Sequence, residues 1–132
     1  MRREKLLFAN DQFYLAFNNS DYELMDALWA QQSPVVCIHP GWPALTDREA
    51  ILDSWERILA GSESPGITHD NVKVFDHGTL ALVMCYESVG DNRLVVMNAF
   101  IEENGELRMV LHQAGGCAEA PEPEPQSRPY MQ

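Results

Sequence analysis

Hydrophobic residues recur at helical spacing over the first part of the chain. Between residues 4 and 18 the apolar positions that share one side of a helix are Leu6, Leu7, Phe13, Tyr14 and Phe17. The polar positions between them are Glu4, Asn10 and Asp11. This pattern predicts an amphipathic helix that buries one side and leaves these polar residues to solvent.

Two further helices are predicted to begin at capping boxes. Ser20 lies three residues before Glu23, and Thr46 lies three residues before Glu49. In this motif the hydroxyl oxygen and the carboxylate each accept a hydrogen bond from a backbone N–H group at a helix start. The apolar stripe expected on the later helix consists of Ile51, Trp55 and Ile58.

The second half of the chain has the character of extended strands. Apolar runs bounded by turn sequences predict five strands, at about residues 35–39, 67–75, 79–88, 93–102 and 106–113. These runs are apolar at both alternating positions, so both faces of the sheet need cover. We expect helices on one face and a second copy of the chain on the outer face, which gives an α+β fold and a homodimer.

The turn at Asn104 and Gly105 determines the expected register of the last hairpin. Asn-Gly between two apolar runs is the strongest short hairpin signal, because both turn positions favour a positive φ. A two-residue loop pairs Met97 with His112 and places His112 and Asn98 on opposite faces. A different register would exchange those faces.

Charge limits the range of partners. The 132 residues carry 20 acidic and 9 basic side chains, and the net charge of -11 repels nucleic-acid phosphate and anionic membrane surfaces. We therefore expect no nucleic-acid or membrane partner and a ligand that is neutral or cationic.

No apolar run approaches the roughly 18 residues of a membrane span, and the start does not resemble a signal peptide, so a cytoplasmic protein is expected.

Length and composition divide the chain into one domain and a tail. A chain of this size fits a single domain, assigned to residues 1–117. Residues 118–132 are rich in proline and glutamate and lack the apolar side chains that order a segment. We expect a flexible acidic tail there.

The three cysteines, Cys37, Cys85 and Cys117, do not predict a disulfide framework or a metal site. Their number is odd and two lie in apolar runs, so we interpret them as reduced thiols. Cys37 and His39 share one strand face, but a metal ion needs three or four converging ligands and no second pair is evident. The sequence predicts neither a metal nor a cofactor.

The strand at 35–39 ends in the sequence CIHPGWP, residues 37–43. His39 precedes a proline and is therefore held extended, Gly41 gives the backbone freedom for a turn, and Pro43 fixes the exit of the chain. The motif predicts a stiff corner over which Trp42 can fold.

Several of these motifs together carry a family resemblance. The corner at 39–43, the Ser54-Trp55 pair, the Asn-Ala-Phe sequence at 98–100 and the closing run at 110–114 resemble the SnoaL-like branch of the nuclear-transport-factor-2-like superfamily, over about residues 5–117. The resemblance implies a strongly curved sheet wrapped around three helices, a cone with an internal pocket, and dimerisation through the outer sheet face. The chain departs from its relatives at Leu107, Leu111 and Gly115, where they tend to have tryptophan, histidine and serine.

The resemblance also implies a chemistry. Enzymes of this superfamily use a buried carboxylate or histidine to move a proton next to a carbonyl, often with a tyrosine donor. Here that implies His112 or His39 as the base and Tyr86 as the donor, with Glu87 if it points inward. The alternative for each histidine is a structural one, hydrogen-bonded at the rim of the core. No aspartate falls within a core strand, which counts against a cyclase or isomerase of the familiar kind.

Three more residues, Trp42, Trp55 and Asn98, are expected to line the pocket. For Trp42 the alternative is simple hydrophobic capping, and for Asn98 it is a structural hydrogen bond, because a buried amide needs partners. The function predicted is binding of a small, largely apolar molecule, with isomerase- or lyase-type proton transfer. The alternative is a non-catalytic association module whose dimer or acidic tail recruits a protein partner.

Overall fold

The computed structural model describes residues 1–61 and 66–125, and the end of the predicted tail, 126–132, lies outside them. The helices are α1 (Arg3–Asn18), α2 (Tyr22–Leu28) and α3 (Arg48–Ala60). The strands are β1 (Val36–Ile38), β2 (Thr68–Asp76), β3 (Ala81–Val89), β4 (Asn92–Glu103) and β5 (Glu106–Gly116). None of the helices in this part of the chain is long and apolar enough to cross a membrane.

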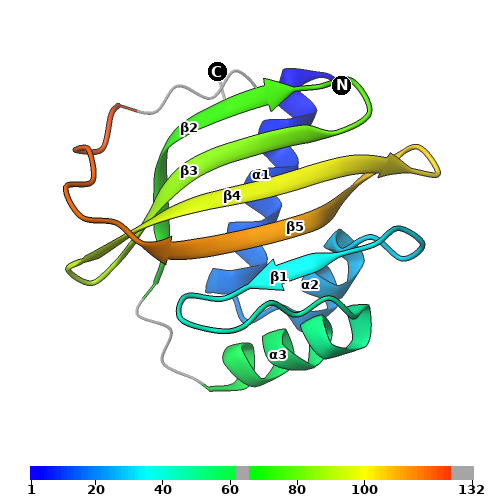
Figure 1. Cartoon of the computed structure of the whole chain (residues 1–132), viewed down its shortest axis with the longest axis horizontal. Coiled ribbons are helices and arrows are strands. Elements are labelled where there is room, and N and C mark those ends of the chain that lie inside the picture. Colours follow the sequence, from blue (N-terminus) through cyan, green and yellow to red (C-terminus); the bar gives the residue numbers. More distant parts are fainter. Residues whose placement is uncertain (62–65, 126–132) are drawn as a thin grey trace.

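The strands form one mixed sheet. Their order is β1-β5-β4-β3-β2, with β1 parallel to β5 and every other pair antiparallel. Figure 1 shows α1 crossing behind the sheet, and α2 and α3 lying beyond its β1 edge. The predicted α+β fold, a curved and mostly antiparallel sheet around three helices, is confirmed.

The curvature of the sheet has a local cause in β2. The register of β2 with β3 shifts between Asp70 and Lys73, and Asn71 within that bulge has a φ of 54°. A bulge adds an unpaired residue and bends the strand, and asparagine tolerates the left-handed region better than most residues. Figure 1 shows β2 turning over the end of the sheet.

The core lies between α1 and the inner face of the sheet. Phe13 of α1 is fully buried, and its ring packs edge-on against Trp55 of α3 at 5.4 Å between centroids. Burial of one such side chain contributes on the order of 2 to 3 kcal/mol. The predicted periodicity of α1 and α3 therefore corresponds to packing that holds both helices in place.

The two predicted capping boxes were placed one residue too early. Asp21 accepts a hydrogen bond from the N–H of Leu24 and caps α2, and Asp47 accepts one from the N–H of Ala50 and caps α3. Ser20 has a φ of 52° and closes α1 instead. Aspartate caps as well as serine or threonine and adds a charge that the helix dipole favours.

The predicted register of the last hairpin was wrong beyond its first residues. Glu103 pairs with Glu106 as expected, but a bulge at Val110 shifts the pairing, so that Asn98 faces His112. One extra residue in a strand exchanges the faces of every residue that follows it. His112 and Asn98 therefore lie on the same buried face instead of opposite faces.

Candidate functional site

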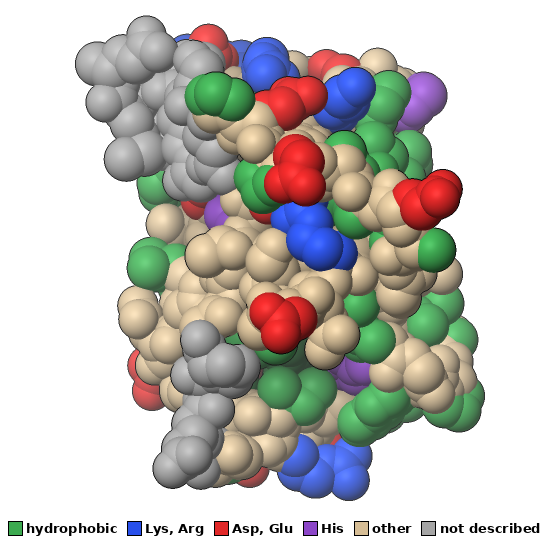
Figure 2. Space-filling model, turned by 90° about the vertical axis from the view of Figure 1, so that its left-hand side faces the viewer, with side chains coloured by type: hydrophobic (Ala, Val, Ile, Leu, Met, Phe, Trp, Pro, Cys, Tyr) green, Lys and Arg blue, Asp and Glu red, His purple; other side chains and the backbone are tan. Residues whose placement is uncertain are grey.

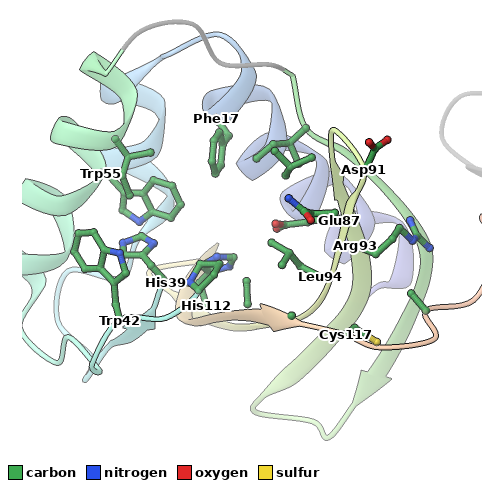
Figure 3. Close-up of a pocket in the computed structure, with 18 of the residues that line it drawn as sticks. Phe17, His39, Trp42, Trp55, Glu87, Asp91, Arg93, Leu94, His112 and Cys117 are labelled. Carbon is green, nitrogen blue, oxygen red and sulfur yellow. The ribbon is translucent and has the colours of Figure 1, made fainter.

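A cavity of about 930 Å³ opens between the helices and the inner face of the sheet. Its apolar walls include Phe17, Trp55, Ile58, Leu59, Leu94 and Ala114. Three buried polar side chains also line it: His39, His112 and Glu87. Figure 3 shows the two histidines on one side of the cavity and Glu87 on the other. An apolar cavity of roughly 300–1,000 Å³ with a few convergent polar groups is the usual form of a small-molecule site.

A chain of buried amides holds His112 in place. Its Nδ1 is 2.7 Å from Oδ1 of Asn98, and Nδ2 of Asn98 donates to Oδ1 of Asn10 at 2.8 Å. Asn10 was expected at the surface, but it is buried on the sheet-facing side of α1. The structure places Asn98 behind His112 and not on the cavity wall, so Asn98 positions a lining residue without lining the cavity itself.

His39 is fixed by the helix that packs against its strand. Its Nε2 is 2.9 Å from Oγ of Ser54, whose hydroxyl donates to the carbonyl of Ile51 at 2.6 Å. The Trp42 ring lies edge-on to His39 at 4.8 Å, at the mouth of the cavity. Because β1 runs parallel to β5, the rings of His39 and His112 come within 6.4 Å of each other.

Burial keeps both imidazole rings neutral. It lowers the pKa of His39 to about 4 and the pKa of His112 to about 3, and at His112 the neighbouring His39 lowers the pKa further. A ring with so low a pKa is a weak base, because its protonated form is costly to make. Each ring is therefore suited to hydrogen bonding at neutral pH.

Glu87 is the buried carboxylate of the cavity. Its Oε2 accepts a hydrogen bond of 2.6 Å from the hydroxyl of Tyr14. Desolvation raises the pKa of Glu87, while the bond from Tyr14 and the proximity of His69 act in the opposite direction. Burial also raises the pKa of Tyr14 well above its usual value, so the phenol stays neutral and donates. The result is a carboxyl group with increased proton affinity facing an apolar cavity.

Tyr86 does not reach this cavity. Residues alternate along β3, so Cys85 and Glu87 point inward and Tyr86 is half-buried on the outer face, where the guanidinium of Arg93 lies 5.5 Å over its ring. The tyrosine that donates to the carboxylate is Tyr14, from α1. Both faces of β3 are rich in apolar residues, so alternation alone did not reveal which face is inward.

The roles of three residues in the site were not predicted from the sequence: those of Asn10, Tyr14 and Ser54. Asn10 and Tyr14 are four residues apart and share one side of α1. The spacing of Asn10 and Tyr14, one helical turn apart, was therefore the pattern in the sequence that could have indicated two polar groups on the buried side of α1. Ser54 was part of the Ser54-Trp55 pair that carries the family resemblance, but nothing in that pair indicated its hydrogen bond to His39.

The buried cysteines are not suited to nucleophilic chemistry. Cys37 and Cys85 are free thiols within the core, and burial raises the pKa of each to about 12. A thiol with so high a pKa supplies almost no thiolate at neutral pH. Within residues 1–61 and 66–125, no three histidine, cysteine or acidic side chains gather in a way that could hold a metal ion.

One edge of the cavity is formed by residues 117–125, which we call the C-terminal strap. Cys117, Glu119 and Ala120 of the strap line the cavity. Arg93 donates to the carbonyl of Pro121 at 2.7 Å and is itself held by two hydrogen bonds to Asp70. Figure 2 views the molecule from this end, where acidic and basic side chains are interspersed over the surface.

Asn71 attaches the strap a second time. Its Nδ2 donates to the carbonyl of Glu122 at 3.1 Å, and its Oδ1 accepts from the N–H of Glu124 at 2.7 Å. A flexible tail was predicted from residue 118 onward, and within its described part Pro121, Glu122 and Glu124 are hydrogen-bonded to Arg93 and Asn71 of the sheet. These bonds were not predicted from the sequence, because they depend on Asn71 at the bulge of β2 and on Arg93, and not on apolar burial.

Comparison with known proteins places the chain in a family. A family model described as a SnoaL-like domain matches residues 7–115. None of the curated proteins matches the chain significantly.

Solved structures share the same architecture. A candidate dehydratase from the NTF2-like family from Streptomyces avermitilis is 30% identical, with a TM-score of 0.77 over 87% of this chain and 95% of that one. A candidate association domain of calcium/calmodulin-dependent protein kinase type II from Thiobacillus denitrificans is 26% identical, with a TM-score of 0.71 over 83% of this chain and 93% of that one. A protein with a cystatin-like fold from Nostoc punctiforme is 15% identical and has a TM-score of 0.70 over 89% of this chain and 92% of that one. With its fold, its cavity and the match over residues 7–115, the chain belongs to the SnoaL-like family of the NTF2-like superfamily.

Proposed function

We propose that the cavity binds a small, largely apolar molecule and that Glu87 transfers a proton on it, in an isomerase- or lyase-type reaction. The observation that carries the proposal is a buried carboxylate with a raised pKa in an apolar cavity. A carboxyl group whose pKa is raised can take up and release a proton near neutral pH more readily than an exposed one. The hydroxyl of Tyr14 orients it.

Glu87 suits this role better than either histidine. His112 was the proton carrier expected from the sequence, but a pKa of about 3 leaves the protonated ring almost unpopulated at neutral pH. We assign His112 and His39 to hydrogen bonding with the ligand, and the proton to Glu87.

The relative described as a candidate dehydratase supports the lyase form of this reaction. In an elimination of water, a base removes a proton from carbon, a C=C bond forms as the C–O bond breaks, and the hydroxyl leaves with a proton. Glu87 can take the first proton and return it to the departing hydroxyl. A single carboxyl group therefore balances both proton transfers.

Exchange of hydrogen in D₂O tests the proposal without requiring a complete reaction. Small ring compounds that carry a hydroxyl group β to a ketone are incubated with the protein, because the ketone makes the intervening C–H acidic enough to exchange, and mass spectrometry measures the deuterium incorporated at that carbon. Glu87→Gln should lower the exchange rate by about 10²- to 10⁴-fold, since it removes the proton carrier and keeps the shape of the side chain. Glu102→Gln, at an exposed position of β4, is the matched control and should retain the rate. An unchanged rate in Glu87→Gln would exclude Glu87 as the proton carrier.

A second candidate function is association through the outer sheet face. Apolar side chains remain partly exposed on the face turned away from the helices: Phe75, Leu82, Met84, Val95, Met97 and Leu111. A face of this kind commonly packs against another protein. The relative described as a candidate kinase association domain supports this candidate, and a homodimer through this face is its simplest form.

Met97→Lys tests the second candidate. The substitution places a charge at the centre of the outer face and should convert a dimer into a monomer in analytical ultracentrifugation, because an unpaired charge is costly to bury. Lys73→Met, at the exposed edge of the same face, is a control that should leave the dimer intact. A wild-type protein that sediments as a monomer would exclude the homodimer.

A further inference from the structure

The three buried polar residues of the cavity each use one polar atom and leave another open. Nδ1 of His112, Nε2 of His39 and Oε2 of Glu87 are all within hydrogen-bond distance of protein groups. Nε2 of His112, Nδ1 of His39 and Oε1 of Glu87 have no partner within residues 1–61 and 66–125. Those three atoms are also not sealed in the core, unlike the unpartnered indole nitrogen of Trp55. They are the groups that a ligand would meet at the buried end of the cavity.

The amide chain determines which nitrogen of His112 carries the proton. Asn98 donates through Nδ2 to Oδ1 of Asn10, so its other atom toward His112 is the carbonyl oxygen Oδ1. A carbonyl oxygen only accepts, and Nδ1 of the ring must therefore donate. In a neutral ring the remaining nitrogen, Nε2, carries a lone pair and no proton.

The same reasoning fixes the proton of His39. The hydroxyl hydrogen of Ser54 is used in the bond to the carbonyl of Ile51, which leaves Oγ to accept from the ring at 2.9 Å. Nε2 of His39 therefore carries the proton, and Nδ1 is the acceptor.

The hydrogen bond at Glu87 completes the pattern for the ionised form of the carboxyl group, which is the form that acts as a base. Its Oε2 accepts from Tyr14, whose phenol is the donor, so the carboxylate presents Oε1 as a further acceptor. Apart from the indole N–H of Trp55, which is sealed in the core, the side chains that could donate a hydrogen bond to a ligand line the exposed or half-buried rim instead: Ser20, Trp42, Asn92, Arg93 and the thiol of Cys117. Figure 3 shows Arg93 at the far edge of the cavity from the histidines.

We infer that the ligand is a small, largely apolar compound that presents hydroxyl groups to the buried end of this cavity, where His39, His112 and ionised Glu87 offer only hydrogen-bond acceptors. The inference rests on the proposed ligand binding and specifies the class of ligand. A hydroxyl group satisfies an imidazole nitrogen or a carboxylate oxygen, whereas a ketone or a carboxylate in the same place would meet lone pairs and gain no bond. A site built to pair with a hydroxyl discriminates against the analogue that lacks it.

Binding of matched compounds tests the class of ligand. The probes are cis-1,2-indanediol, 2-indanol and 2-indanone, which share one bicyclic ring system, and binding is followed by the fluorescence of Trp42 and Trp55 at the cavity. We expect 2-indanol to bind at least about tenfold more tightly than 2-indanone, and the diol to bind at least as tightly as 2-indanol. A ketone that binds as tightly as the alcohol would overturn the inference.

Nitrogen NMR measures the tautomers directly and needs no ligand. Long-range ¹H–¹⁵N correlation spectra of the free protein should show His112 protonated at Nδ1 and His39 protonated at Nε2. In Ser54→Ala the acceptor for His39 is lost, so His39 should populate both tautomers while His112 keeps its own. A proton on Nε2 of His112 or Nδ1 of His39 in the wild type would refute the inference. Correct tautomers combined with no binding of any probe would instead refute the proposed ligand binding, so the two failures are distinguishable.

Discussion

Acidification from pH 7 to pH 5 should destabilise the fold through two buried histidines, His39 and His112. Burial lowers their pKa values to about 4 and about 3, whereas the ordinary value of 6.5 applies to the unfolded chain. Between these values the unfolded chain binds protons that the folded chain does not, so the free energy of unfolding decreases as the pH falls below 6.5. Above pH 6.5 both rings are neutral in the folded and the unfolded chain, so they no longer make the free energy of unfolding depend on pH.

The magnitude follows from the pKa difference. A pH of 5 lies about 1.5 units below the pKa of a histidine in the unfolded chain. At about 1.4 kcal/mol per unit, protonation of each unfolded ring lowers the free energy of unfolding by about 2 kcal/mol. The sum of about 4 kcal/mol is large beside the total of about 5 to 15 kcal/mol for a small domain. Glu87 acts in the opposite direction: because its folded pKa is raised, its contribution to stability is present at low pH and is lost as the pH rises through that pKa.

Urea unfolding of wild type and variants isolates the histidine contribution. Wild type and His112→Gln share Glu87, so the difference between their free energies of unfolding should change by about 2 kcal/mol in favour of the variant between pH 7 and pH 5. Ile51→Val, which deletes one buried methyl group at a cost of about 1 kcal/mol, is the control and should run parallel to wild type at every pH. Parallel curves for wild type and His112→Gln would refute the reasoning, because His112 would then titrate alike in both states.

Three further substitutions probe the rest of the site. Tyr14→Phe removes the donor to the buried carboxylate of Glu87 and should lower the free energy of unfolding in urea by about 1 to 3 kcal/mol at pH 7. The loss should be smaller at a low pH at which Glu87 is protonated, and an equal loss at pH 7 and at that low pH would contradict this. Asn71→Asp keeps the acceptor but loses the donor to the strap, so amide exchange near Glu122 should accelerate while β3 is unaffected, and unchanged exchange would show that the bond contributes nothing. Trp42→Ala opens the mouth of the cavity and should speed dissociation of 2-indanol in stopped-flow fluorescence, which an unchanged rate would contradict.

The helices and strands were predictable because their periodicity is a local property. A helix buries every third or fourth residue, and the spacing of Leu6, Phe13 and Phe17 records this directly. The helix starts were off by one residue, since Asp21 and Asp47 can cap as well as the neighbours chosen for them. The cavity of the structure lies beside the corner at residues 39–43, and His39, Trp42 and Trp55 are among the residues that line it.

The faces of the strands were harder to predict. One extra residue at Val110 brought Asn98 and His112 together, although an unbroken hairpin would have separated them. In β3 both alternating sets contain apolar residues, so the pattern offered no reason to choose Glu87 over Tyr86 as the inward group. A bulge depends on packing across the whole sheet and leaves little trace in sequence.

By itself the sequence determined the fold class, the three helices, the stiff corner after β1 and the acidic charge, because each of these depends on local spacing or on composition. Only the tertiary structure decided the chemistry of the cavity. Tyr14 and Glu87 are distant in the chain, as are Asn10 and His112, and neither partnership has a spacing that a pattern could reveal. Protonation follows from burial and from these partners, so it becomes defined only when the helices close on the sheet.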